Sequence, residues 1–263
     1  MLEAAARAHI PVILLDRPNP INGVDIQGPV ADTTSYTAYM PLPVRHSLTL
    51  GELARYFNTE NHINAALTVI PMQGWHRSYW IDQTSIPWTN PSPNLTSLTA
   101  ATLYPGVALL ETANVSVGRG TSTPFELVGA PFIGTHGSTD AASLAAYLTA
   151  RHIPGVSFAA TTFTASNDVG AHYPCTTACS GVRITVTDRN ALDAPELGIE
   201  LISALHHLYP RDFALDKTST LIANADTMAA LRRGYNPRAI AHTWQAALAA
   251  FKLRAQPYLL YPR

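Results

Sequence analysis

The sequence contains few charged residues, and this scarcity narrows what the protein binds. Only 13% of its 263 residues are charged, and the formal net charge is -1 with the histidines neutral. No cluster of Lys and Arg forms a basic stripe, which a nucleic-acid-binding protein or an anionic membrane surface would require. We therefore expect a neutral or small partner and no nucleic acid.

Cysteine is equally scarce. Cys175 and Cys179, in the stretch CTTAC, are the two cysteines of the chain. Two cysteines are too few for a disulfide framework, and a structural zinc site would need a second pair. We interpret them as ordinary or locally bridged cysteines and expect no metal.

Long apolar runs are also missing. The longest, such as residues 12–15 and 107–110, are far shorter than the roughly 20 residues of a membrane helix. The sequence therefore predicts no membrane span. The first residues carry an acid at Glu3 and an early positive charge at Arg7, which is the wrong order for a secretory signal. Residues 1–9 are instead typical of the end of an amphipathic helix that leads into a strand.

Several well-known catalytic and cofactor motifs do not occur. There is no GxGxxG, and the GRGT at residues 118–121 does not follow the phosphate-loop pattern, so we expect no nucleotide cofactor. There is likewise no GxSxG and no HExxH, which disfavours a serine hydrolase and a zinc protease.

What the chain does contain is enough apolar sequence for a large core, at 47% hydrophobic residues. The apolar stretches 12–15 and 66–72 predict short strands, and each ends in polar residues. Between them, Thr49 and Glu52 form a capping-box pattern that predicts the start of a helix. Because ligands of open α/β sheets bind beyond the carboxyl ends of the strands, this order favours an α/β fold with a binding site there.

The pattern changes after residue 131. We expect a helix over 139–150, strands over 157–163 and 182–187, and a helix over 194–208. Asn236 followed by Pro237 predicts an N-cap and the first residue of a last helix that continues through Leu253. The closing PYLLYPR is expected to pack against a domain surface. We therefore predict a first domain over residues 1–131 and a smaller α+β domain over residues 132–263.

The expected loops gather aromatic, amide, arginine and carboxylate side chains. They are Trp75, Trp80, Trp88, Asn19, Asn22, Asn94, Asn114, Arg17, Arg45, Arg77, Arg119, Asp16, Glu60, Asp82 and Glu111. Aromatic faces with a few convergent polar groups are what a sugar-binding cleft needs. The alternative is that the tryptophans anchor loops and the asparagines serve turns. His46, just before the capped helix, similarly admits a capping or surface role.

The order of longer stretches adds a resemblance. The stretches, in chain order, are DRPNPING, RHSLTLGELARYFN, MQGWHR, IPWTNPSPNL, YPGVALLETANVSVGRGT, PFELVGAP and FKLRAQPYLLYPR. Their succession resembles the exo-β-N-acetylmuramidase (NamZ-like) family from Leu2 to the C-terminus. The resemblance implies a bacterial glycoside hydrolase that releases terminal N-acetylmuramic acid from peptidoglycan fragments, or muropeptides, during cell-wall recycling. It also implies an exported protein, periplasmic or extracellular.

The resemblance implies a fold and an incomplete chain. The fold is α/β, with a partial Rossmann-like parallel-sheet domain that binds no nucleotide, a smaller α+β C-terminal domain and a cleft between them. Family members carry a Pro-Glu-His-Gly element upstream, whose glutamate is a candidate catalytic acid, and this sequence contains no PEHG. We therefore expect a fragment or a shortened descendant. The alternatives are a non-catalytic muropeptide- or carbohydrate-binding protein, and a half that works with a separately encoded N-terminal partner.

Within this chain, Glu111 is the first candidate for a catalytic carboxylate, because it ends the apolar VALLE and precedes the NVSVGRGT loop. The alternative is a structural glutamate paired with Arg119 or Arg17. Arg17, Asn114 and Arg119 are expected to hold the lactyl carboxylate or the N-acetyl group, since arginine suits bidentate carboxylate recognition. The full expected substrate-binding set is Asp16, Arg17, Asn19, Arg45, His46, Trp75, Arg77, Trp88, Asn114 and Arg119.

Overall fold

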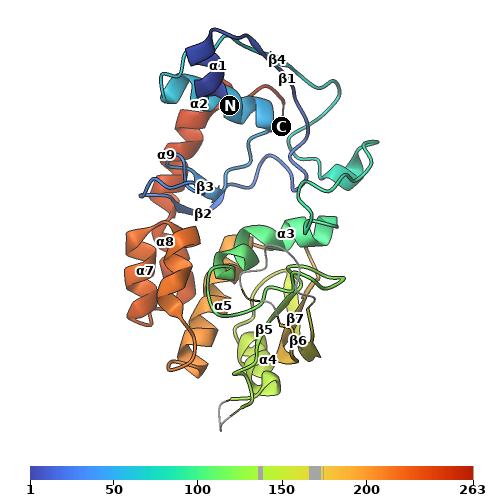
Figure 1. Ribbon diagram of the computed structural model, residues 1–263, viewed down its shortest axis with the longest axis vertical. Helices are drawn as coiled ribbons and strands as arrows, with labels where there is room; N and C mark the ends of the chain where they lie inside the picture. The colour runs from blue at the N-terminus through green and yellow to red at the C-terminus, as the bar shows by residue number, and fades with distance from the viewer. Residues whose placement is uncertain (136–138, 166–172, 174, 263) are drawn as a thin grey trace. The chain divides into compact units, whose positions relative to one another are not determined.

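The computed structural model describes residues 1–135, 139–165, 173 and 175–262 (Figure 1). It is a mixed α/β protein with small parallel and antiparallel sheets. The chain groups into two compact units that interleave in sequence. Unit 1 comprises Met1–Ile26, His46–Trp88 and Ala249–Arg263, and unit 2 comprises Gln27–Arg45 and Thr89–Leu248. The expected domains 1–131 and 132–263 stay a prediction beside this grouping.

Unit 1 is built around two strands that pair in parallel, as the sequence predicted. Its elements are α1 (Leu2–Ala8), β1 (Val12–Leu15), α2 (Leu50–Glu60), β4 (Leu67–Ile70), η1 (Ile81–Gln83), the end of α9 (Gln245–Ala255) and η4 (Gln256–Tyr258). The register places Val12 opposite Leu67 and Leu15 opposite Ile70. The expected N-terminal helix and both strands are confirmed, although the second strand is shorter than residues 66–72.

Helix α2 begins at the predicted capping box. The Thr49 hydroxyl accepts from the Glu52 amide, and the Glu52 carboxylate accepts from the Thr49 amide. On the buried face of α2, Tyr56 packs against Phe251 and Tyr258 with ring centroids 5.8 Å and 5.3 Å away. These contacts fix the C-terminal segment on α2, so the expected packing of the closing residues is confirmed.

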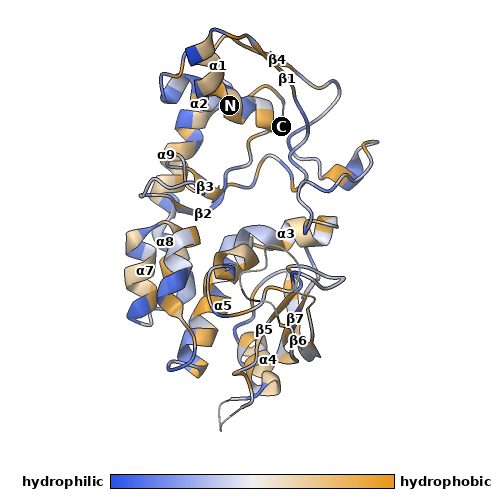
Figure 2. Cartoon of the chain, in the orientation of Figure 1, coloured by the Kyte–Doolittle hydropathy of each residue, from blue (hydrophilic) through white to orange (hydrophobic). Residues whose placement is uncertain are grey.

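Unit 2 contains a three-stranded antiparallel sheet in the order β5-β7-β6, and α4 packs against β6 and β7. Its strands are β2 (Gln27–Val30), β3 (Pro43–Arg45), β5 (Leu127–Ala130), β6 (Val156–Phe163) and β7 (Cys179–Val186). Its helices are α3 (Leu98–Val107), η2 (Ala108–Leu110), α4 (Ala141–Ala150), α5 (Ala194–Leu208), η3 (Leu215–Thr218), α6 (Ser219–Ile222), α7 (Ala225–Arg232), α8 (Pro237–Thr243) and the start of α9. Apolar residues run through α5 and the sheet (Figure 2), and they form the core of the unit.

Helices α3 and α5 touch through their backbones. A Cβ atom added to Gly106 would lie 1.8 Å from the Ala194 carbonyl oxygen, and one added to Gly198 would lie 2.5 Å from the Gly106 carbonyl oxygen. Glycine at both positions therefore permits the close approach. Helix α3 extends past Pro105 and continues into η2.

The last helix is the clearest error of boundary. Asn236 caps α8 with Pro237 at its first position, as predicted, and its side chain accepts from the Arg238 amide. The expected single helix through Leu253 is wrong, because α8 ends at Thr243 and α9 begins after Trp244. Trp244 is buried, and its indole N–H donates to the Thr227 hydroxyl over 3.0 Å, which anchors the break between the helices.

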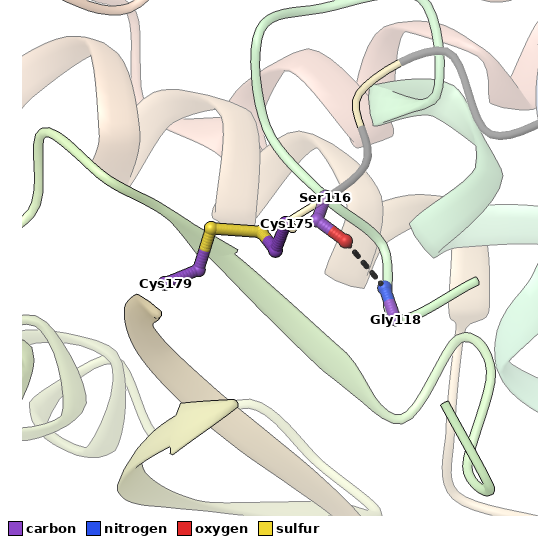
Figure 3. The surroundings of a disulfide bond; sticks show 4 residues. All are labelled: Ser116, Gly118, Cys175 and Cys179. Carbon is purple, nitrogen blue, oxygen red and sulfur yellow. Dashed lines mark hydrogen bonds between the residues drawn. A yellow bond between two sulfur atoms is a disulfide. The ribbon is translucent and has the colours of Figure 1, made fainter. Parts of the chain in front are cut away.

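The two cysteines form a local disulfide, one of the two interpretations left open by the sequence (Figure 3). Their Cα atoms are 5.7 Å apart, and both residues are buried with Ala165 and Phe163. The bridge ties residue 175 to Cys179, the first residue of β7. No helix within the described residues is long and apolar enough to cross a membrane.

Candidate active site

Asp16, directly after β1, is held at the N-terminus of α2. Its Oδ1 accepts from the Gly51 amide over 2.7 Å, and its Oδ2 accepts from the Thr49 and Tyr261 hydroxyls over 2.7 Å and 2.5 Å. A carboxylate at this end of a helix also complements the partial positive charge of the free amides. Burial and the hydrogen bond to Asp16 raise the pKa of Tyr261 well above its ordinary value. Asp16 thus links the end of β1 to Tyr261 near the C-terminus.

Arg77 lies inside unit 1, with 4% of its surface exposed. Its Nη1 donates to Glu52 over 2.5 Å, its Nε to the Gly23 carbonyl over 2.9 Å and its Nη2 to the Ser47 carbonyl over 2.7 Å. The Glu52 carboxylate also accepts from the Leu260 amide over 2.9 Å. Because each guanidinium nitrogen already has a partner, Arg77 is positioned to hold loops together.

Two further residues of the expected set stabilise the same loops. Trp75 is 4% exposed and meets Tyr261 edge-on, with ring centroids 4.9 Å apart. The Asn19 amide donates to the Leu48 carbonyl over 3.3 Å and accepts from the Ile21 amide over 3.2 Å. Both placements fit the alternative that the tryptophans anchor loops and the asparagines serve turns.

His46 and Arg45 precede α2. The Nδ1 of His46 accepts from the Leu48 amide over 3.1 Å, which places the proton of the neutral ring on Nε2. Burial lowers the pKa of His46 from 6.5 to about 4, so the ring is neutral near pH 7. Arg45 is buried and donates to the Gln27 side chain over 2.9 Å.

Arg17 and Trp88 remain accessible among the expected residues of unit 1. Arg17 is exposed, and its guanidinium makes no hydrogen bond or ion pair within the described part of the chain. Trp88 is half-buried and directly follows Pro87. Arg17 is therefore the unit 1 arginine best placed to meet an anion from solvent.

In unit 2, Glu111 and Arg119 form an ion pair. Arg119 Nη1 lies 2.6 Å from Glu111 Oε1, and the two side chains are 22% and 11% exposed. Glu111 follows η2, while Arg119 sits between Gly118 and Gly120, whose φ angles of 78° and 82° favour glycine. The pairing foreseen as the structural alternative for Glu111 is therefore present.

Arg119 keeps donor capacity beyond this pair. Its Nε is buried and has no hydrogen-bond partner among the described residues. An unpaired buried donor is costly to a fold, and a water, an ion or a ligand group can supply its partner. The Glu111–Arg119 pair therefore presents a carboxylate and an unfilled guanidinium donor side by side.

Tyr104 is a neighbour of the pair that the sequence analysis missed. Its ring packs edge-on against Phe125 with centroids 4.9 Å apart, yet 39% of its surface is exposed. Burial, and then the charge of Glu111, raise the pKa of Tyr104, which keeps its hydroxyl protonated. A spacing of two helical turns between Tyr104 and Glu111 was the available signal, because α3 continues into η2.

Asn114 lies on the same loop and has a bridging role. Its side-chain amide donates to the Asp212 carbonyl over 2.7 Å and accepts from the Ala214 amide over 2.8 Å. The structure thus brings Glu111, Arg119 and Asn114 onto one segment of unit 2, and Asp16, Arg17, Asn19, His46, Trp75, Arg77 and Trp88 into unit 1.

Family models match nearly the whole chain. Residues 1–99 match the N-terminal and residues 102–261 the C-terminal region of the model described as exo-beta-N-acetylmuramidase NamZ. A curated relative, the peptidoglycan beta-N-acetylmuramidase NamZ of Bacillus subtilis (strain 168), is 37% identical over 265 residues. That alignment covers 99% of this chain and 62% of the relative, so the chain spans less than two thirds of the relative's length.

Two solved structures are also similar. Both are DUF1343 family proteins from Bacteroides fragilis NCTC 9343, each 28% identical to this chain with a TM-score of 0.77. The similarity covers 99% and 100% of this chain, and 68% and 69% of those chains.

Proposed function

Because the chain belongs to the exo-β-N-acetylmuramidase NamZ family, we propose that it takes part in hydrolysing the bond that holds a terminal N-acetylmuramic acid on peptidoglycan fragments. The substrate class follows from the relative, a peptidoglycan β-N-acetylmuramidase. The parallel pair of β1 and β4 supports the finer proposal that the first part of the chain belongs to a Rossmann-like sheet.

The observation that carries the proposal is the Glu111–Arg119 pair with the unfilled Arg119 Nε. Muramic acid differs from other amino sugars by a lactyl ether that ends in a carboxylate, and arginine is suited to bind a carboxylate with two parallel N–H donors. Arg119 would hold that carboxylate while remaining bonded to Glu111. Tyr104, with its protonated hydroxyl and partly exposed ring, would provide a surface for the sugar.

Glu111 is proposed as a functional carboxylate of the reaction. Glycosidases use two carboxyl groups around an oxocarbenium-like transition state, one as acid and one as base or nucleophile. A carboxylate beside an arginine suits the second role, because it can stabilise positive charge at the anomeric carbon or take a proton from water.

The unit 1 residues of the expected set remain part of the proposal in two ways. Within unit 1, exposed Arg17 is the arginine proposed to meet an anionic ligand. Asp16, Asn19, His46, Trp75 and Arg77 would shape the loops through their internal hydrogen bonds and packing, and Arg45, Trp88 and Asn114 complete the set.

The test is release of N-acetylmuramic acid from a disaccharide that carries it at the non-reducing end. Glu111→Gln should lower turnover about 100-fold or more, because it removes a group that acts in acid–base chemistry. Glu126→Gln is the matched control, since Glu126 is also half-buried beside an arginine, Arg183, and is outside the proposed site. Near-normal turnover by the Glu111→Gln variant would remove Glu111 from the mechanism.

A second candidate function is binding of muropeptides without cleavage. It is favoured by the same unfilled donor of Arg119, because binding an anion there requires no chemistry. Calorimetry with the disaccharide separates the two. Binding without release by the unmodified chain, with affinity unchanged in the Glu111→Gln variant, supports a binding protein, whereas release supports the hydrolase.

A further inference from the structure

A polar cavity lies in unit 2, and neither Glu111 nor Arg119 lines it. It has a volume of about 500 Å³, and we call it the arginine pocket. Its principal lining residues are Tyr147, Arg151, His206, His207, Arg232 and Arg233. All of its lining residues belong to the described part of the chain. They include three arginines and two histidines but no Asp or Glu.

The fold concentrates these cations at one place because several elements end there. Tyr147 and Arg151 are one turn apart at the end of α4, and His206 and His207 occupy the last turn of α5. Helix α7 ends at Arg232, and the chain turns at Gly234, whose φ is 70°.

Two of the arginines are already neutralised. Arg151 binds Glu200 through two hydrogen bonds of 2.8 Å and 2.9 Å, and Arg232 lies 2.7 Å from Asp216. Arg233 is exposed, and its guanidinium makes no hydrogen bond or ion pair within the described residues. The pocket therefore keeps one uncompensated positive charge beside two ion-paired guanidinium groups.

The histidines add a second, independent observation. The Nδ1 of His206 is buried and has no hydrogen-bond partner among the described residues. His207 stacks on Tyr147 with ring centroids 5.5 Å apart and planes at 28°, which makes a flat wall. An Nδ1–H of His206 could donate to an oxygen of a ligand held by Arg233, with the ligand body resting on that wall.

The cavity also continues beyond His206. A neighbouring cavity of about 400 Å³ shares His206, Pro210 and Arg232, and it is further lined by Lys217 and by Asp216, whose carboxylate is paired with Arg232. Together the two can accept a ligand longer than a single anionic group, such as an acid with several anionic substituents.

From this arrangement we propose that the arginine pocket is a binding site for an oxyanion, a carboxylate or phosphate group, on a small polyanionic ligand. The group is held by Arg233 and His206, and the wall formed by Tyr147 and His207 supports its carrier. This function goes beyond the proposed glycoside hydrolysis, because it needs neither Glu111 nor Arg119.

The experiment is calorimetric titration of the whole chain at low ionic strength with three probes: tricarballylate, inorganic phosphate and the trimethyl ester of tricarballylate. We expect millimolar or tighter binding of an anion that weakens with salt, and no binding of the uncharged ester. Binding of tricarballylate alone identifies a carboxylate ligand, and binding of phosphate alone identifies a phosphate ligand. Absence of both, or equal binding of the ester, overturns the proposal.

Two variants locate the binding. Arg233→Gln should weaken it about tenfold, since it removes a charge-assisted hydrogen bond. Arg211→Gln is the matched control, because Arg211 is an exposed arginine near Pro210 that does not line either cavity. If Arg211→Gln weakens binding as much as Arg233→Gln, the effect is general charge attraction and the proposal is wrong.

Two more variants keep the result independent of the proposed active site. His206→Phe retains a ring but no nitrogen, and it should weaken the anion severalfold. Arg119→Gln and Glu111→Gln should leave the anion affinity unchanged. Loss of affinity in Arg119→Gln would place the anion at the proposed active site and overturn the arginine pocket, while loss of turnover in Glu111→Gln concerns the hydrolase proposal alone.

Discussion

Replacing Arg119 by glutamine tests the proposed recognition of the lactyl carboxylate most directly. The unfilled Nε of Arg119 and the 2.6 Å bond from its Nη1 to Glu111 give the guanidinium one internal partner and one open donor. A hydrogen bond to a charged group contributes about 1.5–3 kcal/mol, and tenfold in affinity corresponds to about 1.4 kcal/mol. The arginine should therefore favour a muramic-acid sugar over the same sugar without the lactyl group by about 10- to 100-fold.

The assay is a cycle of two proteins and two ligands. Affinities of the unmodified chain and of Arg119→Gln are measured for the muramic-acid disaccharide and for its analogue without the lactyl group. The substitution should weaken the first ligand strongly and the second by less than about twofold, because the lost interaction belongs to the carboxylate. An equal loss for both ligands, or preference for the lactyl sugar retained by the variant, would refute this role of Arg119.

Stability must be measured beside affinity, because Arg119 also neutralises Glu111. The two side chains are 22% and 11% exposed, so solvent screens the pair only partly. Its loss should cost about 1 kcal/mol, which is above the usual value for fully exposed pairs and below that for buried ones. For a chain of this size the melting temperature should then fall by about 2–4 °C. A variant that unfolds at room temperature would mean that the pair is mainly structural.

The remaining predictions concern the fold. Joint replacement of Cys175 and Cys179 by alanine should lower the free energy of unfolding by about 2 kcal/mol, which is the loop-closure value for so short a loop. Urea titration measures this change, and an unchanged midpoint would contradict the prediction. Gly106→Ala should lower the free energy of unfolding by more than about 2 kcal/mol, because the added Cβ would overlap the Ala194 carbonyl. Gly74→Ala is the control: a Cβ there meets nothing within 4 Å, so the free energy of unfolding should fall less, mainly because the φ of Gly74 is 72°. Folding lowers the pKa of His46 from 6.5 to about 4, so the unfolded chain binds the proton more readily and stability falls as the pH drops from about 6.5 to 4. His46→Gln should reduce this loss of stability by on the order of 2 kcal/mol, measured by urea titrations at the two pH values. An equal pH dependence in the variant would exclude His46 as its source. Ile13→Thr with Leu15→Thr should reduce self-association at constant melting temperature, because the side chains are 70% and 73% exposed on a strand; unchanged light scattering would show that this face does not mediate contacts.

The elements that the sequence predicted well are those decided by neighbouring residues. Thr49 with Glu52 and Asn236 with Pro237 carry their partners within one helical turn, so both helix starts follow from local pattern. The helix over 194–208 was predicted to the residue, because its polar N-cap Asp193 and apolar face lie in one continuous stretch. The break at Trp244 was missed since it depends on a bond to Thr227, on another helix.

The polar residues of unit 1 were harder to interpret because their partners are far away in sequence. Asp16 binds Tyr261, and Glu52 binds the Leu260 amide as well as Arg77. No local pattern distinguishes a carboxylate that accepts hydrogen bonds from the end of the chain from one that will face a ligand. The arginine pocket escaped notice for the same reason, since its cations come from the ends of separate helices.

Glu111 illustrates why a structural and a functional interpretation of one residue need not compete. An isolated glutamate next to a sugar site would be drawn toward any neighbouring donor, and its orientation would vary. The bond to Arg119 fixes the carboxylate, and the glycines on both sides of Arg119 let the loop bring the guanidinium within 2.6 Å of it. A carboxylate held in one orientation costs less to align with a reacting bond than a mobile one. The same arginine retains an unfilled Nε, so holding Glu111 does not exhaust it. Ion pairing of Glu111 is therefore what a preorganised site would require, and the Glu111→Gln turnover and Arg119→Gln affinity measurements separate the chemical contribution of the pair from its contribution to stability.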